Sequence, residues 1–136
     1  KELFLLNGLK YEPMEEIKSY NEYLKEADTL NEQEKYYQAI KLYEKAIDVN
    51  PDNATFAYNN MGNCLSRIEE IEEAIQAYKK AIEQDYSYVN PLWNLSLIHN
   101  RNKRYDLTID LYEQILKIDL ILYTLYLFLL FPYTSS

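Results

Sequence analysis

The stretch AIKLYEKAIDVNP, residues 39–51, decides the fold of this chain because the chain repeats it twice. A close copy, AIQAYKKAIEQDY, begins at Ala74, and a more divergent copy, TIDLYEQILKIDL, begins at Thr108. The three starting positions are separated by 35 and then 34 residues. A period of this size is typical of arrays in which each repeat is one helical unit that packs on its neighbours.

Each copy has the spacing of an amphipathic helix. In the first copy, Ala39, Tyr43 and Ala46 are four and then three residues apart, which places them on one helix face. A second helical stretch precedes each copy: YNEYLKEADTL from residue 20, AYNNMGNCL from residue 57 and LWNLSLIH from residue 92. The repeating unit is therefore predicted to be helix, short turn, helix.

Small residues recur where the two helices of a unit are expected to touch, because small side chains let helix axes approach closely. The repeated tyrosines are expected to fill the grooves between neighbouring units. Pro51 is expected to end the second helix of the first unit, since proline cannot continue the hydrogen-bond ladder. The expected small-residue pairs are Ala27 with Ala39, Gly62 with Ala74, and Ser96 with Thr108.

This pattern resembles the tetratricopeptide repeat, a 34-residue helix–turn–helix family. The resemblance covers about residues 20–120 and is strongest in the second unit. It implies an all-α fold, a right-handed superhelical array of antiparallel helix pairs with about three units. The predicted units are residues 20–54, 55–88 and 89–120. The third is degenerate, because Thr108, Ile115 and Leu120 replace two small residues and a proline.

The segment before the first unit, residues 1–19, is also predicted to be helical. EPMEEIKSYNEYL, residues 12–24, fits one helix with Pro13 near its first turn. Residues 1–12 fit the end of a preceding helix that closes at Asn7 and Gly8. On this interpretation the chain is a part of a longer array.

The segment after the third unit, residues 121–136, is predicted to be an apolar tail. Residues 120–131, LILYTLYLFLLF, carry no charge. A helix of that length spans about 18 Å, less than the roughly 30 Å of a bilayer core, so no transmembrane span is expected. Three interpretations remain: the tail packs onto the last repeat as a cap or into a partner, it mediates self-association, or it is not native coding sequence.

Composition disfavours catalysis and nucleic-acid binding. The formal net charge is −8, so no basic stripe is available to neutralise phosphates. His99 is the only histidine and Cys64 the only cysteine, and two glycines cannot build a phosphate-binding loop. We therefore expect no enzyme activity, no cofactor and no metal site. A lone cysteine fits a reducing compartment, and a cytoplasmic location is expected.

The resemblance implies that the first helices line a concave surface. An asparagine amide both donates and accepts hydrogen bonds, so a column of amides can bind a peptide backbone. Asn60 and Asn94 occupy equivalent positions, similar to an asparagine ladder, although asparagine is also common there without that role. Trp93 fits either an anchor for an apolar side chain or packing on a neighbouring helix. The predicted peptide-binding residues are Lys25, Asn59, Asn60, Asn63, Arg67, Asn90, Trp93, Asn94 and Arg101.

Chaperone adaptors of this family grip acidic carboxyl-terminal peptides with a clamp of lysine, asparagine and arginine. The matching positions here are Leu24, Asp28, Asn60, Asn90 and Asn94, of which only Asn60 fits. The sequence therefore predicts a protein-interaction scaffold that binds a partner's peptide or helix in the concave groove. The alternative is a structural strut with permanent contacts through the convex face or the apolar tail. A chaperone adaptor ranks third.

Overall fold

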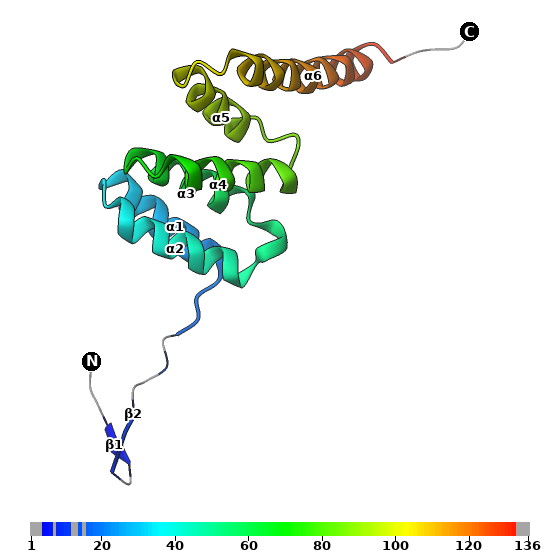
Figure 1. Ribbon diagram of the computed structural model, residues 1–136. Helices are drawn as coiled ribbons and strands as arrows, with labels where there is room; N and C mark the ends of the chain where they lie inside the picture. The colour runs from blue at the N-terminus through cyan, green and yellow to red at the C-terminus, as the bar shows by residue number, and fades with distance from the viewer. Residues whose placement is uncertain (1–3, 7, 12–13, 15, 133–136) are drawn as a thin grey trace.

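The computed structural model describes residues 4–6, 8–11, 14 and 16–132, and in this part of the chain six α-helices form three consecutive pairs (Figure 1). The pairs are α1 (Tyr20–Glu32) with α2 (Tyr36–Val49), α3 (Thr55–Arg67) with α4 (Ile71–Gln84), and α5 (Asn90–Arg101) with α6 (Tyr105–Leu130). A short 3₁₀ turn, η1 (Pro51–Asn53), joins the first two pairs. The predicted all-α array of helix–turn–helix units is confirmed.

The turn inside each pair has the same geometry. Glu34, Glu69 and Lys103 have φ values of 60°, 66° and 57°, in the left-handed region that few side chains adopt. In each turn the next N–H donates to the carbonyl oxygen five residues earlier, at 2.8–2.9 Å. These bonds satisfy carbonyl groups at the end of the first helix, so the repeated strain is balanced by helix capping.

The helix expected over residues 12–24 is wrong, because α1 begins only at Tyr20. Ser19 closes its amino terminus with a capping box: its hydroxyl accepts from the Glu22 N–H at 3.3 Å, and the Glu22 carboxylate accepts from the Ser19 N–H at 2.8 Å. Met14 and residues 16–18 are not helical. Pro13 lies outside the described residues.

The helix expected over residues 1–12 is also wrong for the part that the structure describes, residues 4–6 and 8–11. The segment holds an antiparallel hairpin of β1 (Phe4–Leu6) and β2 (Leu9–Tyr11), in which Leu6 pairs with Leu9 (Figure 1). Gly8 has φ 78°, which suits a tight hairpin turn. An Asn-Gly pair signals a two-residue hairpin as well as a helix end, and here the strands on either side decide for the hairpin.

The repeated tyrosines pack across the first helix of their own unit. Tyr43 is fully buried, and its hydroxyl donates to Asp28 Oδ1 at 2.6 Å. Tyr78 is likewise buried and donates to Asn63 Oδ1 at 2.7 Å. A Cβ at Gly62 would lie 2.7 Å from Cε1 of Tyr78, so this glycine makes room for the tyrosine ring. The sequence analysis paired Gly62 only with Ala74 and did not include the Tyr78 ring, which needs the same space.

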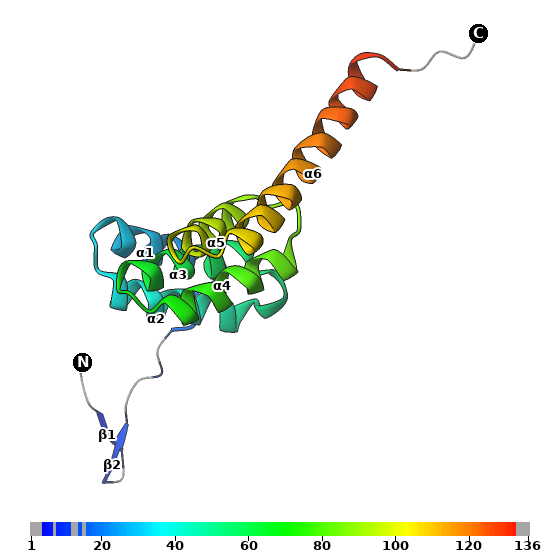
Figure 2. The ribbon, with the colours of Figure 1, turned by 45° about the horizontal axis from the view of Figure 1, so that its top comes forward.

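The apolar tail continues α6 without a break to Leu130, so no separate cap forms. Residues 119–132 are all exposed, and Figure 2 shows this part of α6 projecting beyond the other helices. The interpretation in which the tail packs onto the last repeat is therefore wrong for the described residues. None of the helices that the structure describes has the length and apolarity to cross a membrane.

Candidate functional site

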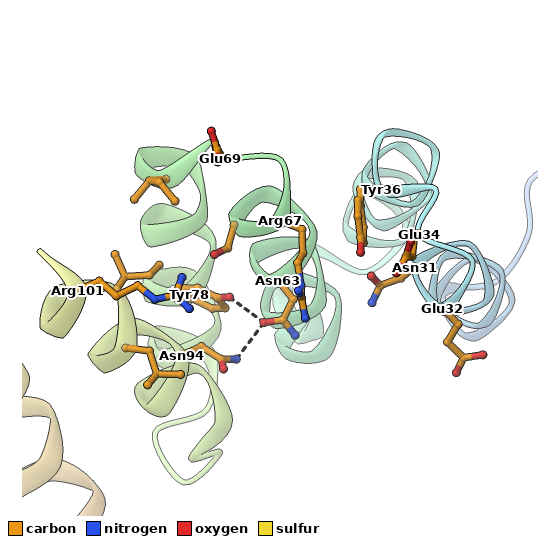
Figure 3. A pocket seen from close by; sticks show the side chains of 14 residues that line it. Asn31, Glu32, Glu34, Tyr36, Asn63, Arg67, Glu69, Tyr78, Asn94 and Arg101 are labelled. Atoms are coloured by element: carbon orange, nitrogen blue, oxygen red, sulfur yellow. Dashed lines mark hydrogen bonds between the residues drawn. The ribbon is translucent and has the colours of Figure 1, made fainter.

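A hollow of about 1030 Å³ opens on the side of the array that the first helices line (Figure 3). Its walls come from the end of α1 and the α1–α2 turn, from the carboxyl-terminal half of α3, from the α3–α4 turn and α4, and from α5. All three units contribute to these walls, so the complete hollow exists only once the units stack. The lining residues are Asn31, Glu32, Glu34, Tyr36, Asn63, Ser66, Arg67, Glu69, Ile71, Tyr78, Asn94, Leu97, Ile98 and Arg101.

Side-chain amides join neighbouring units at the floor of this hollow. Asn94 Nδ2 donates to Asn63 Oδ1 at 3.0 Å and to Asn59 Oδ1 at 3.1 Å. Asn63 Oδ1 also accepts the Tyr78 hydroxyl, as the dashed lines in Figure 3 show. Both N–H groups of Asn94 are thus used, and its Oδ1 is the atom left to accept a bond from a ligand.

The amide network continues toward the first unit. Asn59 Nδ2 donates to Asn60 Oδ1 at 3.2 Å, and Asn60 Nδ2 donates to Asp28 Oδ1 at 2.9 Å. Asn60 therefore retains one N–H and one acceptor lone pair, so it can still pair with a peptide backbone in both directions. Asn94 cannot do so without breaking an internal bond. Asn60 and Asn94, the two positions of the predicted ladder, therefore differ in the hydrogen-bonding groups that they leave for a ligand.

The structure brings four of the predicted binding residues together in the hollow: Asn63, Arg67, Asn94 and Arg101. Asn59 is buried, so the prediction that it lies on the groove surface is wrong: its amide bonds to two other asparagines. The remaining predicted residues lie outside the lining. Asn60 is half-buried, Lys25 and Asn90 are exposed, and Trp93 is exposed with its ring 5.4 Å from that of Tyr112.

Sequence reasoning missed the wall formed by the α1–α2 turn, which contributes Glu32, Glu34 and Tyr36. The repeat period holds a signal for it. Glu32 lies 35 residues before Arg67, and Arg67 lies 34 residues before Arg101, so the three are equivalent positions. The repeated stretches that begin at Ala39, Ala74 and Thr108 are also separated by 35 and then 34 residues. The turn carries the same signal, because Glu34 and Tyr36 lie 35 residues before Glu69 and Ile71, which also line the hollow.

Arg67 and Arg101 are exposed, and neither forms an ion pair with any residue that the structure describes. Burial raises the pKa of Tyr78, and the Arg67 charge acts in the opposite direction on that pKa. The positive charge of Arg67 therefore opposes the rise in the pKa of the Tyr78 hydroxyl, which lies at the floor of the hollow. Two cationic groups without carboxylate partners face the same space.

Cys64 and His99, the one cysteine and the one histidine of the sequence, do not line this hollow. Burial raises the pKa of the Cys64 thiol to about 11, and the Asp28 charge acts in the same direction, so the reactive thiolate is disfavoured. Burial lowers the pKa of His99, and the Arg104 and Lys79 charges add to this effect. Among the described residues no group of three or more acidic, histidine or cysteine side chains could hold a metal ion.

Stacked helix pairs with an open, polar hollow on one side define a helical-repeat domain. The chain belongs to the tetratricopeptide repeat family: models described as "Tetratricopeptide repeat" match residues 20–87 and 59–119. The matched ranges span all six helices except the distal part of α6.

The curated relatives are much longer proteins. Hsp70-Hsp90 organizing protein 3 of Arabidopsis thaliana is 31% identical over 87 residues, which are 64% of this chain and 15% of that protein. DnaJ homolog subfamily C member 3 homolog of Dictyostelium discoideum is 27% identical over 122 residues, 82% of this chain and 24% of that protein. The peroxisomal targeting signal receptor of Kluyveromyces lactis is 36% identical over 64 residues, 47% of this chain and 11% of that protein.

Solved structures share the fold at low identity. The crystal structure of MamA matches with a TM-score of 0.73 and 19% identity, over 76% of this chain and 60% of that one. The second TPR of Spaghetti (RPAP3), bound to the HSP90 peptide SRMEEVD, matches with a TM-score of 0.67 and 19% identity, over 73% of this chain and 91% of that one. These neighbours show the solenoid architecture.

Proposed function

We propose that this chain is a non-catalytic module that binds an extended segment of another protein in the hollow. The observation that carries the proposal is that a polar hollow of about 1030 Å³ is built from three units and keeps unused hydrogen-bonding groups on its walls. A volume of about 1000 Å³ is at the upper end for small-molecule sites and suits several peptide residues. A cytoplasmic location belongs to the same proposal.

An extended backbone fits the chemistry of the hollow. A peptide presents alternating N–H and C=O groups, and Asn94 Oδ1 is placed to accept from one N–H. Leu97, which is 51% exposed, gives the same hollow an apolar contact for a side chain. Binding a backbone with few constraints on side chains is a property of an interaction scaffold.

A chaperone-adaptor role is favoured by the names of several relatives and by the peptide bound to the RPAP3 domain. The residues at the clamp positions argue against it. Asp28 accepts hydrogen bonds from Tyr43 and Asn60, so an acceptor carboxylate stands where the clamp has a donor amide. An all-acidic carboxyl-terminal peptide would meet this charge, and we rank the adaptor role below the general scaffold.

Replacing Asn94 by alanine should weaken peptide binding by about 0.5–1.5 kcal/mol, the usual net value of one hydrogen bond. The peptides for this test are selected from a random-peptide display library on the wild-type chain, and affinity is measured by calorimetric titration. Asn100→Ala is the matched control, because Asn100 is an exposed asparagine on the same helix. The proposal fails if no peptide is selected above background, or if both variants bind as the wild type does.

A structural strut is the second candidate, and the outer face of α6 favours it. On α4, Ile75 and Tyr78 are 8% and 2% exposed because the α5 side chains Leu92, Leu95 and Ile98 share their core cluster. The equivalent α6 residues, Ile109 and Tyr112, are 55% and 37% exposed. This apolar face continues into residues 120–131. In purified protein, we propose that a second copy of the chain covers it.

Ending the chain at Asp119 should convert a self-associating protein into a monomer in which α1–α5 are intact and α6 is shortened. The twelve residues 120–131 are removed from water in the assembly, and apolar burial of about 25 cal/mol per Å² drives association. Light scattering coupled to size-exclusion chromatography measures the mass of both forms, and circular dichroism checks the fold. If the wild-type chain is monomeric at all concentrations, the structural-strut proposal is contradicted and the peptide-binding proposal is the one that stands.

A further inference from the structure

The charged residues of the hollow are divided between its walls. Arg67 and Arg101 come from the α3 and α5 side, and Glu32 and Glu34 come from the α1–α2 end (Figure 3). Glu69, on the α3–α4 turn, also lines the hollow and forms no ion pair with either arginine among the described residues. A ligand in this space therefore meets only carboxylates at the α1–α2 end, and meets both arginines together with Glu69 on the opposite side.

We infer that the hollow selects peptide segments of mixed charge, with a carboxylate placed at Arg67 and Arg101 and a basic side chain facing Glu32 and Glu34. The inference rests on the proposed function and names the class of peptide that this site takes. It assigns specificity to the last turn of each first helix, whereas the clamp positions of the adaptor proteins lie earlier in these helices.

The arginines have the chemistry for this role. Neither guanidinium is paired with a carboxylate in the described part of the chain, so binding an anion requires no ion pair to be broken. Arginine presents a planar fork of N–H donors that matches a carboxylate in a bidentate geometry. Asn63 also lies on the floor, and its Nδ2 group, which the amide network does not use, can donate to the carboxylate.

Glu32 and Glu34 disfavour a purely acidic ligand through charge repulsion. The chain carries a formal charge of −8, and Glu32 and Glu34 place part of it at one end of the hollow. A peptide with carboxylates along its whole length would gain at Arg67 and Arg101 and lose at the opposite wall. Like charges juxtaposed across an interface are a common source of specificity, so the acidic wall excludes such peptides.

Arg67 and Arg101 also lie in the last turns of α3 and α5, where a cation stabilises the helix dipole. That structural role predicts a change in unfolding and no change in peptide preference. The binding role predicts the reverse. Measuring both properties on the same variants separates the two explanations.

The test uses three fluorescein-labelled dodecapeptides of serine and alanine with blocked termini, measured by fluorescence anisotropy. One carries glutamates in one half and lysines in the other, one carries glutamates throughout, and one is uncharged. The mixed peptide should bind the wild-type chain about 10-fold more tightly than the uncharged one, and salt should reduce this difference. A fourth peptide, uncharged but with a free carboxyl terminus, tells whether a terminal carboxylate substitutes for a side chain.

The double variant Arg67→Gln with Arg101→Gln should abolish the advantage of the mixed peptide, and Glu32→Gln with Glu34→Gln should improve binding of the all-glutamate peptide. Lys41→Gln with Lys117→Gln, two exposed lysines on α2 and α6, gives the same change in net charge as the arginine pair and should preserve the preference. Equal binding of all peptides, no binding of the mixed peptide up to about 1 mM, or an arginine variant that keeps the preference overturns the inference. The display selection above decides separately whether the hollow binds peptides.

Discussion

Replacing Tyr43 by alanine should destabilise the chain by about 3–5 kcal/mol, the range for removing a buried aromatic side chain. Tyr43 is 0% exposed, belongs to the core cluster that joins the first unit to α3, and donates a hydrogen bond to Asp28 at 2.6 Å. The variant loses dispersion contacts, and Asp28 Oδ1 keeps only the hydrogen bond from Asn60 Nδ2. Since small domains are stable by about 5–15 kcal/mol in total, this change removes a large share.

Tyr37→Ala is the matched control for this prediction. Tyr37 lies on the same helix and is 69% exposed, so its removal should change the free energy of unfolding by at most about 0.5 kcal/mol. Urea unfolding followed by circular dichroism measures both variants. Similar losses for the two tyrosines would show that Tyr43 is not a core residue.

Replacing Gly62 by valine should destabilise the chain by about 3 kcal/mol, at the upper end of the range for overpacking a core. A Cβ at this position meets Cε1, Cδ1 and Cζ of Tyr78 at 2.7, 2.8 and 3.0 Å. The ring cannot move away easily, because it is 2% exposed and its hydroxyl is bonded to Asn63. Alanine should cost less, since its better helix propensity of about 1 kcal/mol offsets part of the strain.

A double-mutant cycle tests the cause of this effect. If the Tyr78 ring is the obstacle, Gly62→Val should cost distinctly less in a Tyr78→Leu background, because leucine leaves space where the ring stood. Urea unfolding of the four proteins gives the coupling energy. An equal cost in both backgrounds would mean that valine acts through the α3 backbone and not through the tyrosine.

The site shows the limit of sequence reasoning most clearly in its asparagines. The family resemblance implied that Asn63, Asn94, Arg67 and Arg101 lie on one side of the array, and the structure gathers them in one hollow. The repeat period gave no way to see that Asn59 is buried and bonded to Asn94. Burial depends on the neighbouring unit, which contributes atoms that are 30 or more residues away in the chain.

The sequence by itself determined the helices, their pairing and their number of units, because these follow from spacings of three and four residues within each unit and from the repeat period. Two local signals led to wrong predictions before the first unit. The pair Asn7-Gly8 fits both a helix end and a hairpin turn, and the strands form a hairpin. Pro13 suggested an early helix start, whereas the capping box of Ser19 and Glu22 starts α1 at Tyr20. Only the tertiary structure decided which tyrosine Gly62 accommodates, which amides bond to each other, and that residues 119–132 stay exposed. These features arise from stacking, which sets contacts between residues that no short spacing relates.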